Sequence, residues 1–141
     1  MSHRPEALIF DLDGTLFQTE TLLLPAYHAA FDQLKKEGLF TGETPPEERI
    51  LSSLGQLLEQ IWMNVMPEAS NEARLRMDIL LLAKQMEYLG QGMGTLYPEV
   101  EATLKRLHQE GVRLFVASNG LEGYVKHVMQ AKGLAPLFEG L

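Results

Sequence analysis

The stretch ALIFDLDGTLFQTE, residues 7–20, decides the fold class. Its first four residues, ALIF, are continuously apolar and run directly into Asp11, Leu12, Asp13 and Gly14. A short apolar run that ends in a turn signal is typical of a strand buried on both faces of a parallel sheet. The stretch therefore predicts a buried strand that carries two carboxylates at its carboxyl end.

The composition is that of a globular protein. The chain has 141 residues, 45% of them hydrophobic, with no cysteine and a formal net charge of −7. The lack of cysteine excludes thiolate catalysis and is compatible with a reducing cytoplasm. The acidic balance argues against a nucleic-acid partner, because the basic residues are scattered. No apolar run reaches the length of a signal-peptide core or of a membrane span of ~20 residues. A soluble, cytoplasmic protein without a membrane partner is expected.

The chain between residues 20 and 90 is expected to form a helical bundle. Apolar residues recur at helical spacing in three segments. Gly38 and Gly90 stand where the first and third helices would end, and Gly55 is a candidate break in the second. The expected buried stripes are Leu23, Tyr27, Ala30 or Phe31, and Leu34 in residues 21–37; Ile50, Leu54, Leu57, Ile61 and Val65 in the second; and Leu75, Ile79, Leu82, Met86 and Leu89 in the third. Trp62, Met66, Met77 and Met86 are interpreted as core residues.

Residues 90–96, GQGMGTL, allow two readings. Three glycines in five positions are compatible with a phosphate-binding loop, but this stretch lacks the lysine of a nucleotide loop and does not follow a strand. A flexible connector between the bundle and the sheet is the better interpretation.

The remaining chain predicts a helix, a second apolar strand and a last helix. The first of these helices is expected to begin with Pro98 at its first position and to end at Gly111. The second strand, VRLFVA at 112–117, leads into Ser118, Asn119 and Gly120. Tyr124, Val125, Val128 and Met129 form the apolar stripe of the last helix, and LFEGL at 137–141 is expected to begin a third strand.

This order predicts an α/β fold, a Rossmann-like parallel sheet core that is incomplete in this chain, with an inserted helical domain. A strand–helix–strand path implies a right-handed parallel crossover, with functional groups at the carboxyl ends of the strands. Asp11, Asp13 and Ser118 all lie at such ends, so the fold is expected to bring them together.

Paired carboxylates at one strand end suit phosphoryl transfer. Two like charges so close need a cation or a shared proton, and Mg²⁺ commonly binds through one or two carboxylates together with a substrate phosphate. A carboxylate can also attack phosphorus, while its neighbour exchanges protons with the leaving group and water. Gly14 lets the backbone approach a phosphoryl group closely, and the hydroxyls of Thr15 and Ser118 can donate to its oxygens.

These residues resemble the first two motifs of the haloacid dehalogenase-like (HAD) hydrolase superfamily, with DLDGTL after one apolar strand and VASNG after another. The stretches LFQTE and LYPEVEATLKRLHQEGVRLFVASNG are most similar to its phosphoglycolate phosphatase-like branch. The resemblance implies a Rossmann-like core at 1–19 and 91–141 and a helical cap at 20–90, hinged at 15–20 and 90–96.

The resemblance also implies roles for the site residues. Asp11 would be the nucleophile and a Mg²⁺ ligand. Asp13 would be the general acid and base and would give the metal its backbone carbonyl. Ser118 and the Asn119 backbone would hold the phosphate of a small phosphorylated metabolite.

Two departures from the family pattern are visible. Gln18 stands where an acidic residue is usual, which could change substrate preference. The Lys and the further acids that complete the family's site have no match after Ser118, because Lys126 and Lys132 lie in the following helix and Glu139 is next to the last residue. We therefore expect a fragment, a truncated product or half of an assembly, such as a homo-oligomer or strand-swapped dimer, with little phosphatase activity from these 141 residues alone.

Several alternatives remain open from the sequence. A dehalogenase would use the same nucleophile on carbon but would not need Asp13, and a phosphomutase would share the whole site. A truncated, non-catalytic relative would retain the cap as an interaction module or would exist as a swapped oligomer.

Overall fold

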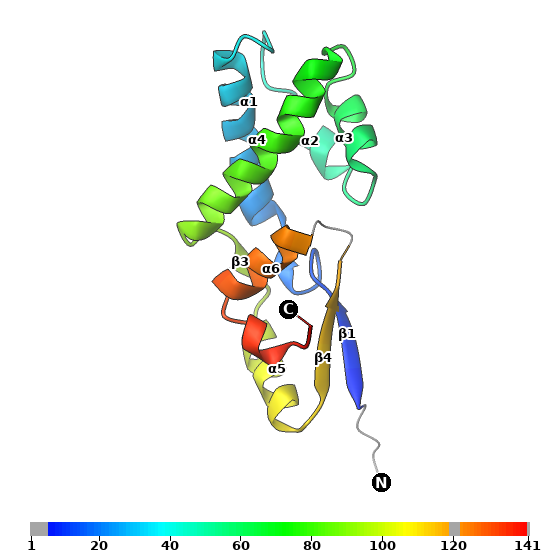
Figure 1. Ribbon diagram of the computed structural model, residues 1–141, viewed down its shortest axis with the longest axis vertical. Coiled ribbons are helices and arrows are strands. Elements are labelled where there is room, and N and C mark those ends of the chain that lie inside the picture. The colour runs from blue at the N-terminus through cyan, green and yellow to red at the C-terminus, as the bar shows by residue number, and fades with distance from the viewer. Residues whose placement is uncertain (1–5, 119–121, 141) are drawn as a thin grey trace. The chain divides into compact units, whose positions relative to one another are not determined.

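The computed structural model describes residues 6–118 and 122–140, which divide into two compact units. The helical unit, Glu20–Tyr88, contains α1 (Glu20–Lys36), α2 (Glu47–Leu51), α3 (Leu58–Val65) and most of α4 (Asn71–Gly90). The sheet unit comprises Met1–Thr19 and Leu89–Leu141. Its elements are β1 (Ala7–Asp11), β2 (Phe17–Gln18), β3 (Thr95–Leu96), α5 (Val100–Gln109), β4 (Arg113–Ala117), α6 (Glu122–Ala131) and the 3₁₀ helix η1 (Ala135–Leu137) (Figure 1). None of the described helices is both long enough and apolar enough to span a bilayer.

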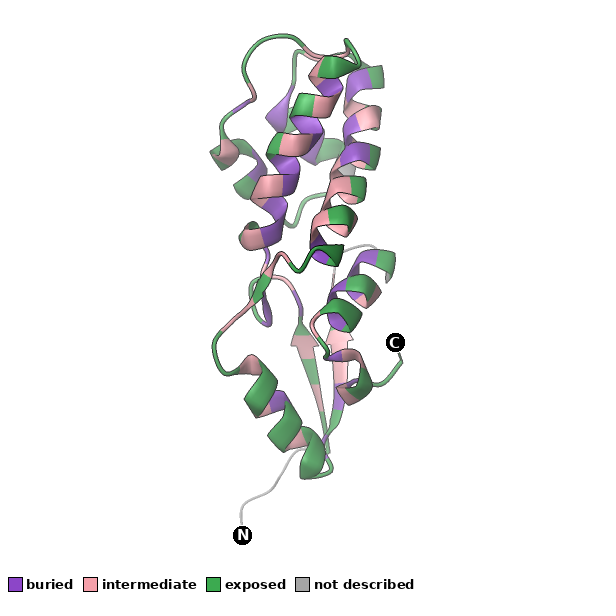
Figure 2. Cartoon of the chain, turned by 90° about the vertical axis from the view of Figure 1, so that its left-hand side faces the viewer, coloured by how far each residue is buried: buried purple, intermediate pink, exposed green. Residues whose placement is uncertain are grey.

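The two apolar strands form a parallel pair, as predicted. β1 and β4 run side by side with Ala7 opposite Arg113 and Asp11 opposite Ala117 (Figure 1). The expectation that β1 is buried on both faces is wrong for the described residues. Ile9 is 73% exposed whereas Leu114 is fully buried, and Figure 2 shows exposed and half-buried residues along most of both strands. The reason is that, in the described residues, the parallel sheet has only these two strands. Side chains are packed against one face of this sheet, and the other face is left exposed.

A second, antiparallel ribbon joins the two connections to the helical unit. β2 pairs with β3, with Phe17 opposite Leu96 and Gln18 opposite Thr95. The Gln18 side chain also donates to the carbonyl of Leu96 at 3.1 Å. The interpretation of 90–96 as a flexible connector throughout is therefore corrected, because its last two residues form a strand.

The segments after the ribbon differ from expectation at two ends. The helix predicted from Pro98 begins at Val100, because Glu99 adopts a left-handed conformation with φ of 66°. The segment predicted to start a third strand instead forms η1, which is followed by an extended Phe138. The N–H of Glu139 donates to the carbonyl of Leu114 in β4 at 2.8 Å. This backbone hydrogen bond resembles those between neighbouring strands of a sheet.

The core of the helical unit gathers around α1 and α3. The predicted stripe of α1 is confirmed, because its members are all 3% exposed or less: Leu23, Tyr27, Ala30, Phe31 and Leu34. Trp62, Met66 and Met77 lie in the same cluster, as predicted, whereas Met86, also predicted as a core residue, is only half-buried. The ring of Phe31 has edge-on contacts with Tyr27 and Trp62, at centroid distances of 4.9 and 6.4 Å.

Two predicted stripes of this unit are partly wrong. The second segment is divided at Gly55, where φ is 92°, and the break shifts the helical phase. Leu54 and Leu57 are therefore 46% and 74% exposed. In α4 the core takes up the face of Ala73, Met77 and Leu80, and it leaves Leu75 and Ile79 58% and 60% exposed.

Candidate functional site

The turn after β1 sets the directions of the two aspartates. The carbonyl of Leu12 accepts the N–H groups of Leu16 and Phe17 at 3.0 and 2.9 Å. Leu12 is fully buried between an exposed Asp11 and a half-buried Asp13. This alternation in burial points both carboxylates away from the side that Leu12 covers.

Gly14 and Thr15, which the sequence predicts as phosphate-binding residues, belong to the same turn. Gly14 has a φ of 78°, which is unfavourable for residues with a side chain. Its N–H donates to the carbonyl of Phe17 at 2.9 Å, so this amide already has a partner within the turn. A Cβ added to Gly14 would meet nothing within 4 Å. Gly14 is therefore required by the backbone conformation, and Thr15 lies exposed beside it.

The register of the parallel pair brings the two motifs to one edge of the sheet. Asp11 lies opposite Ala117, and Ser118 is the next residue of that chain segment. Ser118 is half-buried and has an interaction partner within the structure. Asn119, the other predicted phosphate ligand of this loop, lies outside the described residues.

The carboxylate of Asp13 is held by two hydroxyl groups. Thr19 Oγ1 donates to Asp13 Oδ1 at 2.7 Å, and the Tyr124 hydroxyl donates to the same oxygen at 2.9 Å. Burial raises the pKa of Tyr124 well above its ordinary value, and the charge and hydrogen bond of Asp13 raise this pKa further. The phenol therefore stays protonated and remains a donor at any physiological pH.

The donors at this edge fit a hard cation. Mg²⁺ prefers oxygen ligands and keeps several waters, so one or two carboxylates suffice together with a substrate phosphate. Asp11 is exposed and chemically suited to this use. Across residues 6–118 and 122–140, no three His, Cys, Asp or Glu side chains gather closely enough to hold a metal ion. Among the described residues, Asp11 and Asp13 are the carboxylates that follow β1 at this edge.

Of the two lysines in the segment after the second motif, Lys132 has a described hydrogen bond away from the aspartates. Lys132 lies one residue beyond α6 and donates to the carbonyl of Met93 at 3.1 Å. Desolvation lowers the pKa of Lys132. This lysine ties the end of α6 to the loop before β3. Lys126, within α6, is half-buried and has a partner in the structure.

Hollows in the surface lie elsewhere. One of about 550 Å³ is found at the start of α5 and is lined by Tyr97, Glu99 and Lys105 among others. A second of about 300 Å³ lies between α3 and α4, beside Trp62 and Asp78. Neither of these two hollows is lined by Asp11, Asp13 or Ser118, so the candidate site is identified by its side-chain chemistry.

Sequence reasoning missed the contact of Tyr124. The apolar stripe of the last helix is buried as predicted, but its tyrosine was interpreted as packing only. A buried phenol usually finds a hydrogen-bond partner, and that rule is the signal that could have directed attention to a polar group near the start of α6. The sequence pattern predicts no role for Thr19, which lies in the stretch LFQTE.

Comparisons with curated proteins identify relatives that are longer than this chain. A phosphoglycolate phosphatase of Vibrio vulnificus is 32% identical over 137 residues, covering 93% of this chain and 58% of the relative. The pyrophosphatase PpaX of Listeria monocytogenes is 25% identical over 142 residues, covering 99% of this chain and 59% of the relative. The chain therefore spans less than two thirds of the length of these relatives.

Solved structures share the fold. CbbY from Rhodobacter sphaeroides in complex with phosphate superposes with a TM-score of 0.75 at 22% identity, covering 96% of this chain and 62% of that one. A predicted phosphoglycolate phosphatase from Haemophilus somnus gives a TM-score of 0.75 at 22% identity, covering 96% and 60%. The predicted α/β class with a parallel sheet is confirmed. A family model described as haloacid dehalogenase-like hydrolase matches residues 5–141, and the chain accordingly belongs to the haloacid dehalogenase-like hydrolases.

Proposed function

We propose that the protein is a Mg²⁺-dependent phosphatase that hydrolyses a small phosphorylated metabolite through an aspartyl-phosphate on Asp11. The observation that carries the proposal is the register of β1 and β4. It sets Asp11 opposite Ala117, the residue that directly precedes Ser118. A carboxylate nucleophile and a hydroxyl donor are thereby delivered to one edge of the sheet from distant parts of the chain.

The two aspartates take different roles because their surroundings differ. Asp11 is exposed at the strand end, where its carboxylate can reach phosphorus. Asp13 is half-buried and fixed by two hydroxyl donors. A carboxyl held in one orientation suits proton transfer, which needs the acid within hydrogen-bond reach of the leaving oxygen. We therefore assign Asp11 as nucleophile and Asp13 as general acid and base.

The phosphate would be bound by the loops that follow the two strands. Ser118 offers a hydroxyl donor and Asn119 its backbone N–H, while Thr15 adds an exposed hydroxyl beside Gly14. Asp11 and the backbone carbonyl of Asp13 would hold Mg²⁺. When bound, this cation neutralises charge on the phosphoryl oxygens and on the paired carboxylates.

The named relatives support a phosphorylated substrate. They include phosphoglycolate phosphatases and a pyrophosphatase, whose names denote hydrolysis of a bond to phosphorus, and the structure of CbbY from Rhodobacter sphaeroides contains bound phosphate. The chain spans 58% of the first of these relatives, so their full activity is a proposal for this protein. The division into a Rossmann-like core and a helical cap, and a cytoplasmic location, belong to the same proposal.

The experiment compares the protein with an Asp11→Asn variant in the presence of Mg²⁺ and p-nitrophenyl phosphate. We expect little turnover from these 141 residues alone; chelation of the metal should abolish the p-nitrophenol release that is observed, and Asp11→Asn should lower it by at least about a hundredfold. Hydroxylamine should trap the acyl phosphate on the protein, and this readout needs only a single turnover. Asp32→Asn, which changes an exposed aspartate of α1, is the matched control. Equal turnover or equal trapping in the Asp11 variant would remove Asp11 from the mechanism.

A further inference from the structure

The hydrogen bonds of Asp13 are distributed unequally between its two oxygens. Thr19 Oγ1 and the Tyr124 hydroxyl both donate to Oδ1, at 2.7 and 2.9 Å. Both donors are largely buried, with 9% and 8% of each residue exposed. No described contact of the same kind reaches Oδ2. Within the described residues, the carboxyl group is therefore held through Oδ1.

This asymmetry decides which oxygen can carry a proton. A carboxyl oxygen has two lone pairs available to accept hydrogen bonds. Thr19 and Tyr124 occupy both lone pairs of Oδ1, so a proton on Asp13 belongs on Oδ2. In the protonated acid Oδ1 is then the carbonyl oxygen and accepts two bonds, while in the carboxylate the same two bonds persist. The group can gain and lose its proton at Oδ2 without rearranging its partners.

We propose that Tyr124 is a positioning residue that, together with Thr19, orients the Asp13 carboxyl so that Oδ2 alone exchanges protons with the substrate. This inference rests on the proposed phosphatase function. In the step it serves, an Asp11 oxygen forms a bond to phosphorus as the bond from phosphorus to the alcohol oxygen breaks. The proton on Asp13 Oδ2 passes to that departing oxygen, and the leaving group departs as a neutral alcohol.

The position of Tyr124 in the fold makes it suited to this task. It lies in the first turn of α6, 111 positions after Asp13 in the sequence. Its neighbours on the buried face of α6, Val125 and Val128, are 9% and 0% exposed. Tyr124 is itself buried, and its hydroxyl is bound to the Asp13 carboxylate. An anchor of this kind restricts rotation of the carboxyl, which a solvated donor would not do.

The first test is independent of turnover. The side-chain carboxyl carbon of aspartate is isotope-labelled, and the resonance of Asp13 is assigned by its loss in Asp13→Asn. Tyr124→Phe removes only the hydroxyl, so we expect the Asp13 resonance to shift and broaden while those of the other aspartates stay in place. Tyr88→Phe, in the last turns of α4, is the matched control and should leave the Asp13 resonance unmoved. An Asp13 resonance that is identical in Tyr124→Phe would overturn the proposal.

The second test separates positioning from a general loss of structure. In kcat/KM, which covers steps up to release of the alcohol, an alkyl phosphate needs a proton from Asp13 whereas p-nitrophenyl phosphate needs little help because its leaving group is a weak base. We expect Tyr124→Phe to lower kcat/KM about tenfold more for the alkyl ester than for the aryl ester. An equal decrease for both esters would indicate a structural role only and would contradict the proposal.

The two failures are distinguishable. If Asp11→Asn leaves turnover and acyl-phosphate trapping unchanged, the proposed function is wrong, and the resonance of Asp13 still decides whether Tyr124 orients this carboxyl. If Asp11→Asn abolishes trapping but Tyr124→Phe leaves both the resonance and the ester preference unchanged, the phosphatase proposal survives and the positioning role is rejected.

Discussion

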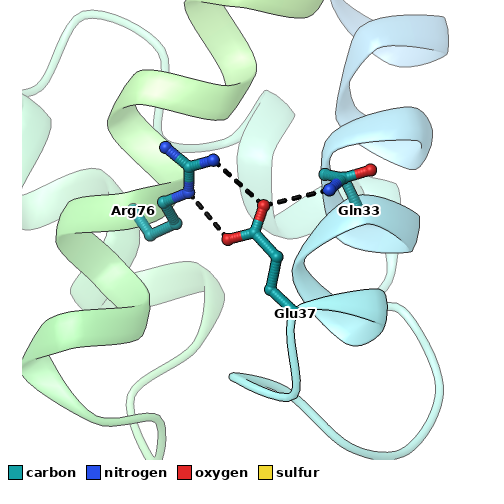
Figure 3. A network of polar contacts seen from close by, with 3 residues as sticks. All are labelled: Gln33, Glu37 and Arg76. Carbon is teal, nitrogen blue, oxygen red and sulfur yellow. Dashed lines mark hydrogen bonds and ion pairs between the residues drawn. The ribbon is translucent and has the colours of Figure 1, made fainter.

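Arg76 binds Glu37 through two parallel hydrogen bonds that join α4 to the end of α1. Its Nε donates to one carboxylate oxygen at 2.8 Å and a terminal nitrogen donates to the other at 3.0 Å (Figure 3). The Gln33 side chain adds a third bond to Glu37 at 3.0 Å. These donors lower the pKa of Glu37 from 4.5 to about 2, with the hydrogen bond from Arg76 as the largest cause.

The first prediction concerns the pH dependence of this contact. A carboxylate with a depressed pKa in the folded state stabilises the fold above its unfolded pKa, and this stabilisation is lost as the pH falls. The contribution of Glu37 should therefore be complete above about 4.5 and should disappear towards about 2. Thermal unfolding should show that Glu37→Gln lowers the melting temperature slightly at neutral pH, since an exposed pair is weak, and flattens its fall in this acidic range.

Glu87→Gln is the control for the first prediction. Glu87 makes one longer contact, to Lys84 at 3.4 Å, and its side chain is more exposed than that of Glu37. We expect the wild-type pH profile in this variant. A Glu37→Gln protein with an unchanged profile would show that the pair with Arg76 is not formed in solution.

The second prediction compares two glycines of the sheet unit. Gly14→Ala should destabilise the protein by about 1–2 kcal/mol, because an L residue is strained in the left-handed region that Gly14 occupies at φ of 78°. Gly123→Ala, in the first turn of α6, should be neutral or stabilising by up to about 1 kcal/mol, because a Cβ there meets nothing within 4 Å. Denaturant unfolding measures both. Equal effects at the two positions would contradict the assigned turn.

The third prediction concerns the Trp62–Asp78 hydrogen bond of the helical unit. Desolvation raises the pKa of Asp78, and Glu59 adds to this shift, while the indole N–H of Trp62 opposes it. A raised carboxyl pKa in the folded state means that the charged form is disfavoured by folding. Asp78→Asn should therefore raise the melting temperature at neutral pH and lose this advantage in acid, while its amide oxygen still accepts from the indole.

Asp78→Ala provides the contrast. It leaves the N–H of Trp62, a residue that is 1% exposed, without its acceptor, at a cost of about 1 kcal/mol or more. The expected order of melting temperatures at neutral pH is the Asn variant, then the wild type, then the Ala variant. The reverse order of the first two would show that the charge of Asp78 stabilises the fold.

The fourth prediction tests the one-sided packing of the parallel sheet. Leu114→Ala should lower the free energy of unfolding by about 2–5 kcal/mol, because a fully buried leucine leaves a cavity. Ile9→Ala in the neighbouring strand should cost less than about 1 kcal/mol, because its side chain is 73% exposed. Urea unfolding compares the two variants. Similar losses would show that another surface covers Ile9 in solution.

Local patterns predicted those parts of the fold that depend on neighbouring residues. The strands around Phe10 and Val116 and the stripe of α1 need only local periodicity. The start of α4 is local as well, because the Ser70 hydroxyl accepts the N–H of Ala73 at 3.1 Å. The exposure of Ile9 could not be predicted from the sequence. An apolar run indicates that its residues favour burial, but it does not tell how many strands flank them in the sheet.

The errors in the helical unit have a second cause. α4 carries two apolar stripes at the same period, one with Ala73 and Met77 and the other with Leu75 and Ile79. Periodicity alone cannot decide which stripe the core selects. The small side chain of Ala73 permits a close approach to the other helices, and the structure buries that face completely.

The candidate site divides in the same way. The motif residues Asp11, Asp13 and Ser118 could be proposed from the sequence because each follows a recognisable strand. The hydrogen bond from Tyr124 to Asp13 could not, because it joins residues 111 positions apart and the rotation of α6 about its axis is set by packing. A local pattern therefore predicts which side chains lie at the sheet edge, but it does not predict which distant side chains form hydrogen bonds with them.

The ribbon of β2 and β3 has a consequence for protein engineering. Because Gln18 lies opposite Thr95 in an antiparallel pair, the chain departs for Glu20–Tyr88 and returns from it through adjacent backbone positions. The intervening segment is, topologically, the loop of a hairpin. We expect that this segment can be replaced by a short turn, or by the corresponding segment of another protein. The two strand ends that the replacement must connect are already paired, so the remaining backbone need not move.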